Sequence, residues 1–176
     1  INLAGGVAQW AQQVDPSITR LADGGYVVVW VDQGGADGSS HGVYGQSYDV
    51  NDAAVGVEFR PNTFTSGAQY EPQVVGLKGG GFVVVWRSDN QDGSSHGVYG
   101  QRYDADDNAV GGEFRISTTT AGAQYEARVV GLTNGGFVAV WRSDNQDGSS
   151  AGVYAQRYDA AGIALGPVGS ASLAVI

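Results

Sequence analysis

The residues that could do chemistry in this chain lie in a loop that occurs three times. The sequence Asp-Gly-Ser-Ser begins at Asp37, Asp92 and Asp147, at intervals of 55 residues. In the second and third copies it overlaps a segment, residues 88–93 and 143–148, that has oxygen-bearing side chains at its first, third and fifth positions and glycine at its sixth. This pattern is typical of the first half of a calcium-binding loop. The candidate calcium ligands are Ser88, Asn90, Asp92, Ser143, Asn145 and Asp147.

The same loop can be explained without a metal. A calcium loop of this type supplies a bidentate glutamate at its twelfth position, where this chain has Tyr99. The alternative is a polar turn in which the side chains of Asp92 and Ser94 bond to backbone amides, and this is the favoured interpretation. A second acidic segment, residues 104–108, is likewise interpreted as a hairpin turn.

Aromatic residues recur beside these loops and indicate a carbohydrate site in each copy. Sugar rings stack on aromatic faces, and their hydroxyls bond to carboxylates and amides. One weak site per copy would gain strength through multivalency. The candidate ligand-binding residues are Trp30, Asp37, His41, Trp86, Asp89, Asn90, Asp92, His96, Trp141, Asp144, Asn145 and Asp147. For the tryptophans the favoured alternative is packing in the core, because Trp86 ends an apolar run that is predicted to be a core strand.

Catalysis is not expected from these residues. Catalytic sites normally need an acid and a base in different environments, whereas the repeat duplicates every candidate here. His41 and His96 occupy the same place in two copies, and Ala151 replaces them in the third. We therefore predict that the chain is not an enzyme, and a fragment of a propeller enzyme is the weakest alternative.

The elements that carry the loops are predicted to be short strands. The chain reads as one repeat domain over residues 1–176, with units at approximately 11–63, 64–118 and 119–176. In the second unit we expect strands near residues 72–77, 82–86, 97–103 and 110–116, separated by Gly- and Asp-rich turns. The predicted fold is all-β, with three four-stranded antiparallel repeats that resemble β-propeller blades. Closed propellers usually have four to eight blades, so a pseudo-threefold β-trefoil or β-prism is the alternative.

Composition excludes several classes of protein. The 176 residues include 9 Lys and Arg against 18 Asp and Glu, a formal net charge of −9, which disfavours binding to nucleic acid. The chain has no apolar run of about 18 residues, so we expect no membrane insertion. The absence of cysteine excludes disulfides and thiolate metal sites.

The repeat unit resembles a known module. Its motifs are Gly-Gly-Phe-Val-Val-Val-Trp from Gly80, and Gly-Val-Tyr-Gly-Gln-Arg-Tyr-Asp from Gly97. They are similar to a repeat of large secreted bacterial proteins grouped with RTX-type adhesins, and more loosely to the blades of sialidase-like propellers. The resemblance implies an extracellular or cell-surface, non-catalytic, adhesive module that could depend on calcium. The chain lacks the Gly-Gly-x-Gly-x-Asp repeats that hold calcium in that family, and residues 104–108 lack the tryptophan of the sialidase-like turn.

The leading hypothesis is thus a secreted or surface-exposed bacterial binding module, lectin-like or adhesin-like, whose partner is a carbohydrate or cell-surface glycan. The alternative is a structural spacer, stiffened by calcium, or a self-assembling subunit that binds its neighbours. Both hypotheses are compatible with a homo-oligomer, because two chains of three units could complete a six-bladed ring.

Overall fold

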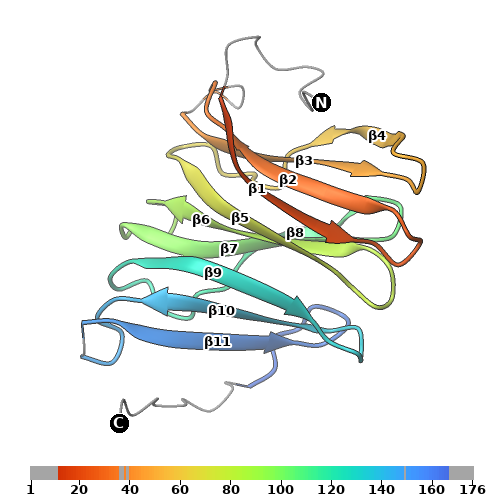
Figure 1. The fold of residues 1–176 in the computed structure, drawn as a ribbon. Coiled ribbons are helices and arrows are strands. Elements are labelled where there is room, and N and C mark those ends of the chain that lie inside the picture. Colours follow the sequence, from red (N-terminus) through yellow and green to blue (C-terminus); the bar gives the residue numbers. More distant parts are fainter. Residues whose placement is uncertain (1–11, 36–37, 39, 149, 167–176) are drawn as a thin grey trace.

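Three antiparallel sheets, stacked one on another, make up the fold (Figure 1). The computed structural model describes residues 12–35, 38, 40–148 and 150–166. We call the sheets blades 1 to 3. Blade 1 contains β1 (Gln13–Arg20), β2 (Tyr26–Asp32), β3 (Gly42–Tyr48) and β4 (Ala54–Phe59). Blade 2 contains β5 (Gln69–Gly76), β6 (Phe82–Asp89), β7 (His96–Tyr103) and β8 (Ala109–Arg115). Blade 3 contains β9 (Gln124–Gly131), β10 (Phe137–Ser143) and β11 (Gly152–Tyr158).

Each blade is a simple meander in which strands adjacent in sequence pair with each other. The first strands of the blades, β1, β5 and β9, lie side by side across the stack (Figure 1). In blade 3 the backbone reaches the place of a fourth strand, where Ala164 pairs with Tyr158 and the Leu165 N–H donates to the Arg157 carbonyl. The prediction of an all-β fold built from propeller-like blades is confirmed.

The second strand of each blade is the centre of the packing. In β6 the side chains of Val83 and Val85 point to blade 3, and those of Phe82, Val84 and Trp86 point to blade 1. All five are fully buried. A strand covered on both faces needs a continuous apolar run rather than alternation, which is the pattern that the sequence shows here.

A cluster of three aromatic rings repeats at both contacts between blades. Phe82 and Tyr103 of blade 2 stack with their ring centroids 4.7 Å apart, and Phe59 of blade 1 packs on both rings. At the next contact Phe137 and Tyr158 stack at 4.5 Å, and Phe114 of blade 2 packs against Tyr158. Phe59 and Phe114, on the fourth strands of blades 1 and 2, thereby pack against the stacked ring pair of the next blade.

Glycine in the first strands lets the blades approach closely. A Cβ on Gly76 would lie 2.3 Å from the carbonyl oxygen of Arg20 in blade 1, and one on Gly131 would lie 2.8 Å from that of Gly76. Any side chain at these positions would push the neighbouring blades apart. Glycine within a strand often marks such a close approach of another backbone.

The aromatic cluster gives a prediction for stability. Phe82→Ala removes a fully buried ring and should lower the free energy of unfolding by about 3–5 kcal/mol. The matched variant is Tyr26→Ala, because Tyr26 stacks on Tyr48 in the same way but is only half-buried in blade 1. Urea denaturation of samples dilute enough to be monomeric should show a clearly smaller loss of stability for Tyr26→Ala, and equal losses would contradict this description of the blade contacts.

Candidate functional site

The three tryptophans are core residues rather than binding platforms. None of Trp30, Trp86 and Trp141 is more than 3% exposed. The faces of their indole rings are therefore inaccessible to a sugar. Packing in the core, the favoured interpretation, is what the structure shows, and these three candidates for ligand binding by stacking are wrong. The physical reason is that each tryptophan lies on a buried face of its central strand. In blades 2 and 3 this face packs against the preceding blade.

The Asp-Gly-Ser-Ser loop of blade 2 is a polar turn that also reaches blade 3. Asp92 Oδ1 accepts a hydrogen bond from the Ser94 N–H at 3.0 Å, and Ser94 Oγ donates to the carbonyl of Gly122 at 2.7 Å. Gly97 makes room for the carboxylate, since a Cβ there would lie 2.9 Å from Asp92 Oδ2. The predicted turn is confirmed, although Ser94 bonds to a carbonyl rather than to an amide. In blade 1, Asp37 lies outside the described residues.

The candidate calcium ligands are dispersed between the core and the surface. Ser88 and Ser143 are fully buried at the ends of β6 and β10. Asn90 and Asn145 are exposed and have positive φ angles of 61°, and Asp147 is also exposed. Nowhere in the described ranges do three or more His, Cys, Asp or Glu residues form a group that could hold a metal ion. Calcium therefore stays a prediction.

A polar network at the same end of blade 2 joins two of the predicted residues. Asp89 and His96 are cross-strand partners on β6 and β7, and His96 Nδ1 lies 2.7 Å from Asp89 Oδ1. Arg87 Nε lies 3.5 Å from the same oxygen, and Arg87 Nη1 lies 3.1 Å from Glu71 Oε1. The four side chains are each between 21% and 33% exposed, so the network is mostly buried but remains partly accessible to solvent.

Tyr70 ties this network to blade 1. The guanidinium of Arg87 lies 4.5 Å from the centre of the Tyr70 ring, and the His41 ring of blade 1 packs against Tyr70 at 4.9 Å. The backbone follows the same path, because the Gln69 N–H donates to the His41 carbonyl. His41 thus acts at the junction between blades, and the network spans that junction.

Glu71 ties the network to blade 3. It sits at a β-bulge with a positive φ of 54°, and the equivalent Asp15 and Glu126 have φ angles of 51° and 55°. Bulges re-aim side chains, and here the turned carboxylate of Glu71 accepts a hydrogen bond from the Glu126 N–H at 3.0 Å. The sequence signal for this role is an acidic residue at the same place in all three units.

The copies of the site are not equivalent. In blade 3, Arg142 lies 3.8 Å from Asp144 and 5.0 Å from the centre of the Tyr125 ring, and the Tyr125 hydroxyl donates to Asp144. Ala151 stands where blade 2 has His96, so the imidazole is missing. In blade 1 the place of Arg87 is taken by the buried Val31. The network is therefore not repeated in equivalent form, and among the described residues blade 2 alone combines the arginine, the carboxylates and the histidine.

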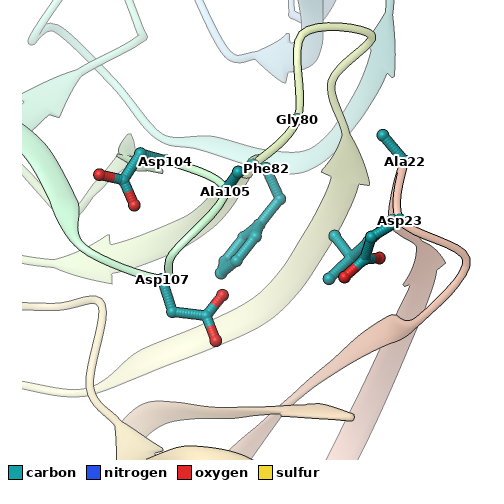
Figure 2. A pocket seen from close by; sticks show the side chains of 9 residues that line it. Ala22, Asp23, Gly80, Phe82, Asp104, Ala105 and Asp107 are labelled. Atoms are coloured by element: carbon teal, nitrogen blue, oxygen red, sulfur yellow. The ribbon is translucent and has the colours of Figure 1, made fainter. Parts of the chain in front are cut away.

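The opposite end of the blades carries a small acidic pocket between blades 1 and 2. Figure 2 shows Asp104 and Asp107 on one turn and Asp23 on the other, with the Phe82 ring between them. Burial, together with the negative charges of Asp104 and Asp23, raises the pKa of Asp107. Hydrogen bonds from the backbone and side chain of Asn108 lower the pKa of Asp104.

Carboxyl groups with opposite pKa shifts can mark an acid and a base in catalysis, but here the turn explains one of them. Asp49 of blade 1 accepts the same kind of backbone bonds, from Ala53 and Asn51, and they lower its pKa in the same way. The shift at Asp104 is thus a property of the repeated hairpin turn, and the interpretation of residues 104–108 as a turn is confirmed.

Solved structures with a similar arrangement of blades are known. An endo-arabinase from Bacteroides thetaiotaomicron aligns with a TM-score of 0.55 and 13% identity, over 88% of this chain and 60% of its own. A thermostable family-43 glycoside hydrolase aligns with a TM-score of 0.56 and 12% identity, over 92% of this chain and 60% of its own. The chain therefore spans about 60% of the length of each of these proteins, and at such identity the likeness concerns the fold alone.

Comparison of sequences adds no family. No family profile matches the sequence, and the search of curated proteins finds no match. The described residues also include no helix that is long and apolar enough to span a membrane. What is established is a set of propeller-like blades that carries a junction-spanning polar network.

Glu71 forms a bridge between Arg87 and the Glu126 N–H, and this bridge can be tested by substitution. Glu71→Gln removes the charge that joins Arg87 to the Glu126 N–H, and should lower the free energy of unfolding by about 1 kcal/mol. Glu126→Gln is the matched control, because Glu126 is exposed in blade 3 and should change stability little. Chemical denaturation of both variants, in samples dilute enough to be monomeric, checks this, and a control as destabilised as Glu71→Gln would refute the bridge.

The contact between Asp92 and Tyr99 predicts a pH effect. Burial and the Asp92 charge raise the pKa of Tyr99 to about 12. The fold therefore favours the neutral phenol, and this contribution to stability is full below pH 10 and lost as the pH rises toward 12. Asp92→Asn should lower the pKa of Tyr99, measured by NMR of ring-labelled tyrosine and assigned with Tyr99→Phe. Asp106→Asn, at the other end of the blade, should leave it unchanged.

Proposed function

We propose that the chain is a non-catalytic carbohydrate-binding module, secreted or displayed at the cell surface. The observation that carries this proposal is the network of Arg87, Asp89 and His96, in which a guanidinium, a carboxylate and an imidazole lie together and are each 21% to 32% exposed. Sugars are held by directional bonds from their hydroxyls to groups of these types. Because the side chains already hold each other in place, little conformational freedom is lost on binding.

The surroundings of the network define how a sugar would be bound. Tyr70 is enclosed by Arg87 and His41, so it supports the network rather than stacking on a ligand. Polar contacts therefore dominate, and affinity at the single complete site in blade 2 is modest. Copies of the chain displayed together would raise the avidity.

Two further observations support the choice of ligand and location. The proteins with similar blades are an endo-arabinase and a glycoside hydrolase, and the analogy of fold favours carbohydrate as the class of ligand. The resemblance of the repeat to a module of secreted bacterial adhesins favours an extracellular or cell-surface location. Both arguments are analogies, and the network supplies the chemistry.

The proposal of a non-catalytic role rests on how the carboxylates are used. Asp89 lies against Arg87 and His96, and Glu71 is shared between Arg87 and the Glu126 N–H. Asp104 caps its own turn. A glycosidase needs one carboxyl group to give up a proton and another to attack or to activate water, and these three are bound in structural roles.

Binding should be measured on a glycan array that includes arabino-oligosaccharides, followed by titration calorimetry with the best ligand. Asp89→Asn combined with His96→Ala should weaken binding at least tenfold, because two of the three polar groups are lost. Asp106→Asn is the control at the opposite end of the blades and should bind normally. Equal binding by the double variant, or no glycan bound by the natural sequence, would reject the site. Release of new reducing ends from the ligand would reject the non-catalytic role.

The same samples test calcium as a partner of the loop. A ligand that binds only the native state raises the midpoint of thermal unfolding. Calcium at Ser88, Asn90 and Asp92 predicts a lower midpoint in chelator than in calcium, and Asp92→Asn should abolish the difference. An unchanged midpoint in the natural sequence would reject the calcium site.

A further inference from the structure

Every blade has two different faces, and the chain shows how they fit together. The forward face meets the following blade, and in blade 2 it includes Val83, Val85 and Val98. The rear face meets the preceding blade, and in blade 2 it includes Phe82 and Trp86. The contact of a forward face with a rear face occurs twice in the described structure, between blades 1 and 2 and between blades 2 and 3.

The forward face of blade 3 has the residues for this contact but is uncovered. Val153 is 70% exposed, whereas the equivalent Val98 of blade 2 and Val43 of blade 1 are fully buried under the next blade. Val130 on β9 is 56% exposed. Since valine occupies the place of Val153 in all three blades, the exposure there reflects a missing neighbour rather than a changed surface.

The rear face of blade 1 is the complementary surface, and it is open in part. Ile18 is 64% exposed, whereas the equivalent Val74 of blade 2 is only 7% exposed. Tyr26 and Tyr48 stack at 5.1 Å, as the buried ring pairs of blades 2 and 3 do, but they are only half-buried. Val28 and Trp30, further along this face, are buried, so the open part is the region of Ile18 and the two tyrosines.

We propose that the forward face of blade 3 binds the rear face of blade 1 of a second copy of this chain, head to tail. The occupant is identified by the two internal contacts, which show what this forward face is shaped to meet. Two copies supply six blades, which is within the range of closed propellers, and two such contacts complete the ring. This inference goes beyond the proposed sugar site and does not depend on it.

Polar groups at the rim fit the same contact. Arg102 of blade 2 donates to the backbone carbonyls of Ala160 and Ala161 in the turn of blade 3. Arg157 of blade 3 occupies the equivalent place, is exposed, and would meet the equivalent turn of blade 1, at residues 50–51. Glu126 would accept the Asp15 N–H of the second copy, as Glu71 accepts the Glu126 N–H within the chain.

The apolar part of the contact must overcome repulsion between two chains that each carry a net charge of −9. Salt screens this repulsion over about 8 Å at 0.15 M ionic strength. Association should therefore strengthen as salt is added, which is opposite to the behaviour of a contact held by pairs of opposite charges.

The test is sedimentation velocity over a range of concentrations, at 0.15 M salt and above. The natural sequence should sediment with twice the mass of one chain. Val153→Asp and Ile18→Asp each place a charge on one open face, and each variant alone should be monomeric, with a dissociation constant raised at least tenfold. Both sites are exposed in the single chain, so circular dichroism should show that both variants fold. Val57→Asp is the control, because Val57 is 83% exposed on β4, at the edge of the sheet opposite the β1 strand of Ile18, and it should leave the mass unchanged.

Mixing the two monomeric variants separates this contact from any other. Val153→Asp retains a natural blade 1 face and Ile18→Asp retains a natural blade 3 face, so the mixture should form one intact contact and recover a dimer. A contact between two identical faces would not be restored by mixing. A natural chain that stays monomeric at every concentration, or a mixture that stays monomeric, would overturn the proposal.

Discussion

The structure depends on burial of both faces of the central strand in each blade. In β6, Val83 and Val85 need blade 3, while Phe82, Val84 and Trp86 need blade 1. Removing either neighbour would expose side chains that together account for much of the apolar driving force. A single unit of this repeat therefore cannot bury its core alone, and the blades stabilise one another in sequence, as in other repeat proteins. The phenylalanines of the fourth strands, the glycines that allow close approach and the hydrogen bonds between blades all stabilise this contact.

The candidate site is a consequence of the same contact. Where two blades meet, the first strand of one lies beside the first strand of the other and beside the segment before the third strand of the preceding blade. Tyr70 of blade 2 therefore meets His41 of blade 1, and Glu71 of blade 2 meets the Glu126 N–H of blade 3. The bulge at Glu71 turns its carboxylate toward this junction, and Arg87 then links it to Asp89. A site built in this way varies from junction to junction even when the repeat is regular. This explains why the loss of a single histidine, at Ala151, leaves blade 3 with only part of the network.

The strands, the repeat and the hairpin turns were predictable because they follow from local patterns of apolar runs, Gly and Asp. The tryptophans were harder, because a residue at the end of an apolar run can face the core or a loop, and only the neighbouring blade decides. Of the network, Asp89 and His96 were predicted, but Tyr70 and Glu71 were not, since their roles depend on contacts with residues of other units. The positive φ at Glu71 and Glu126 carries no local sequence signal of the kind that glycine gives.

Neighbouring blades stabilise each other by covering the central strands, and native-state hydrogen exchange tests this most directly. The experiment compares backbone amides of β6 with those of β10 in a dilute, monomeric sample. β6 is covered on both faces, whereas the forward side chains Val138 and Val140 of β10 are only half-buried. Amides of β6 should exchange only through global unfolding, whereas those of β10 should exchange faster, through local opening. Equal protection of the two strands would contradict it.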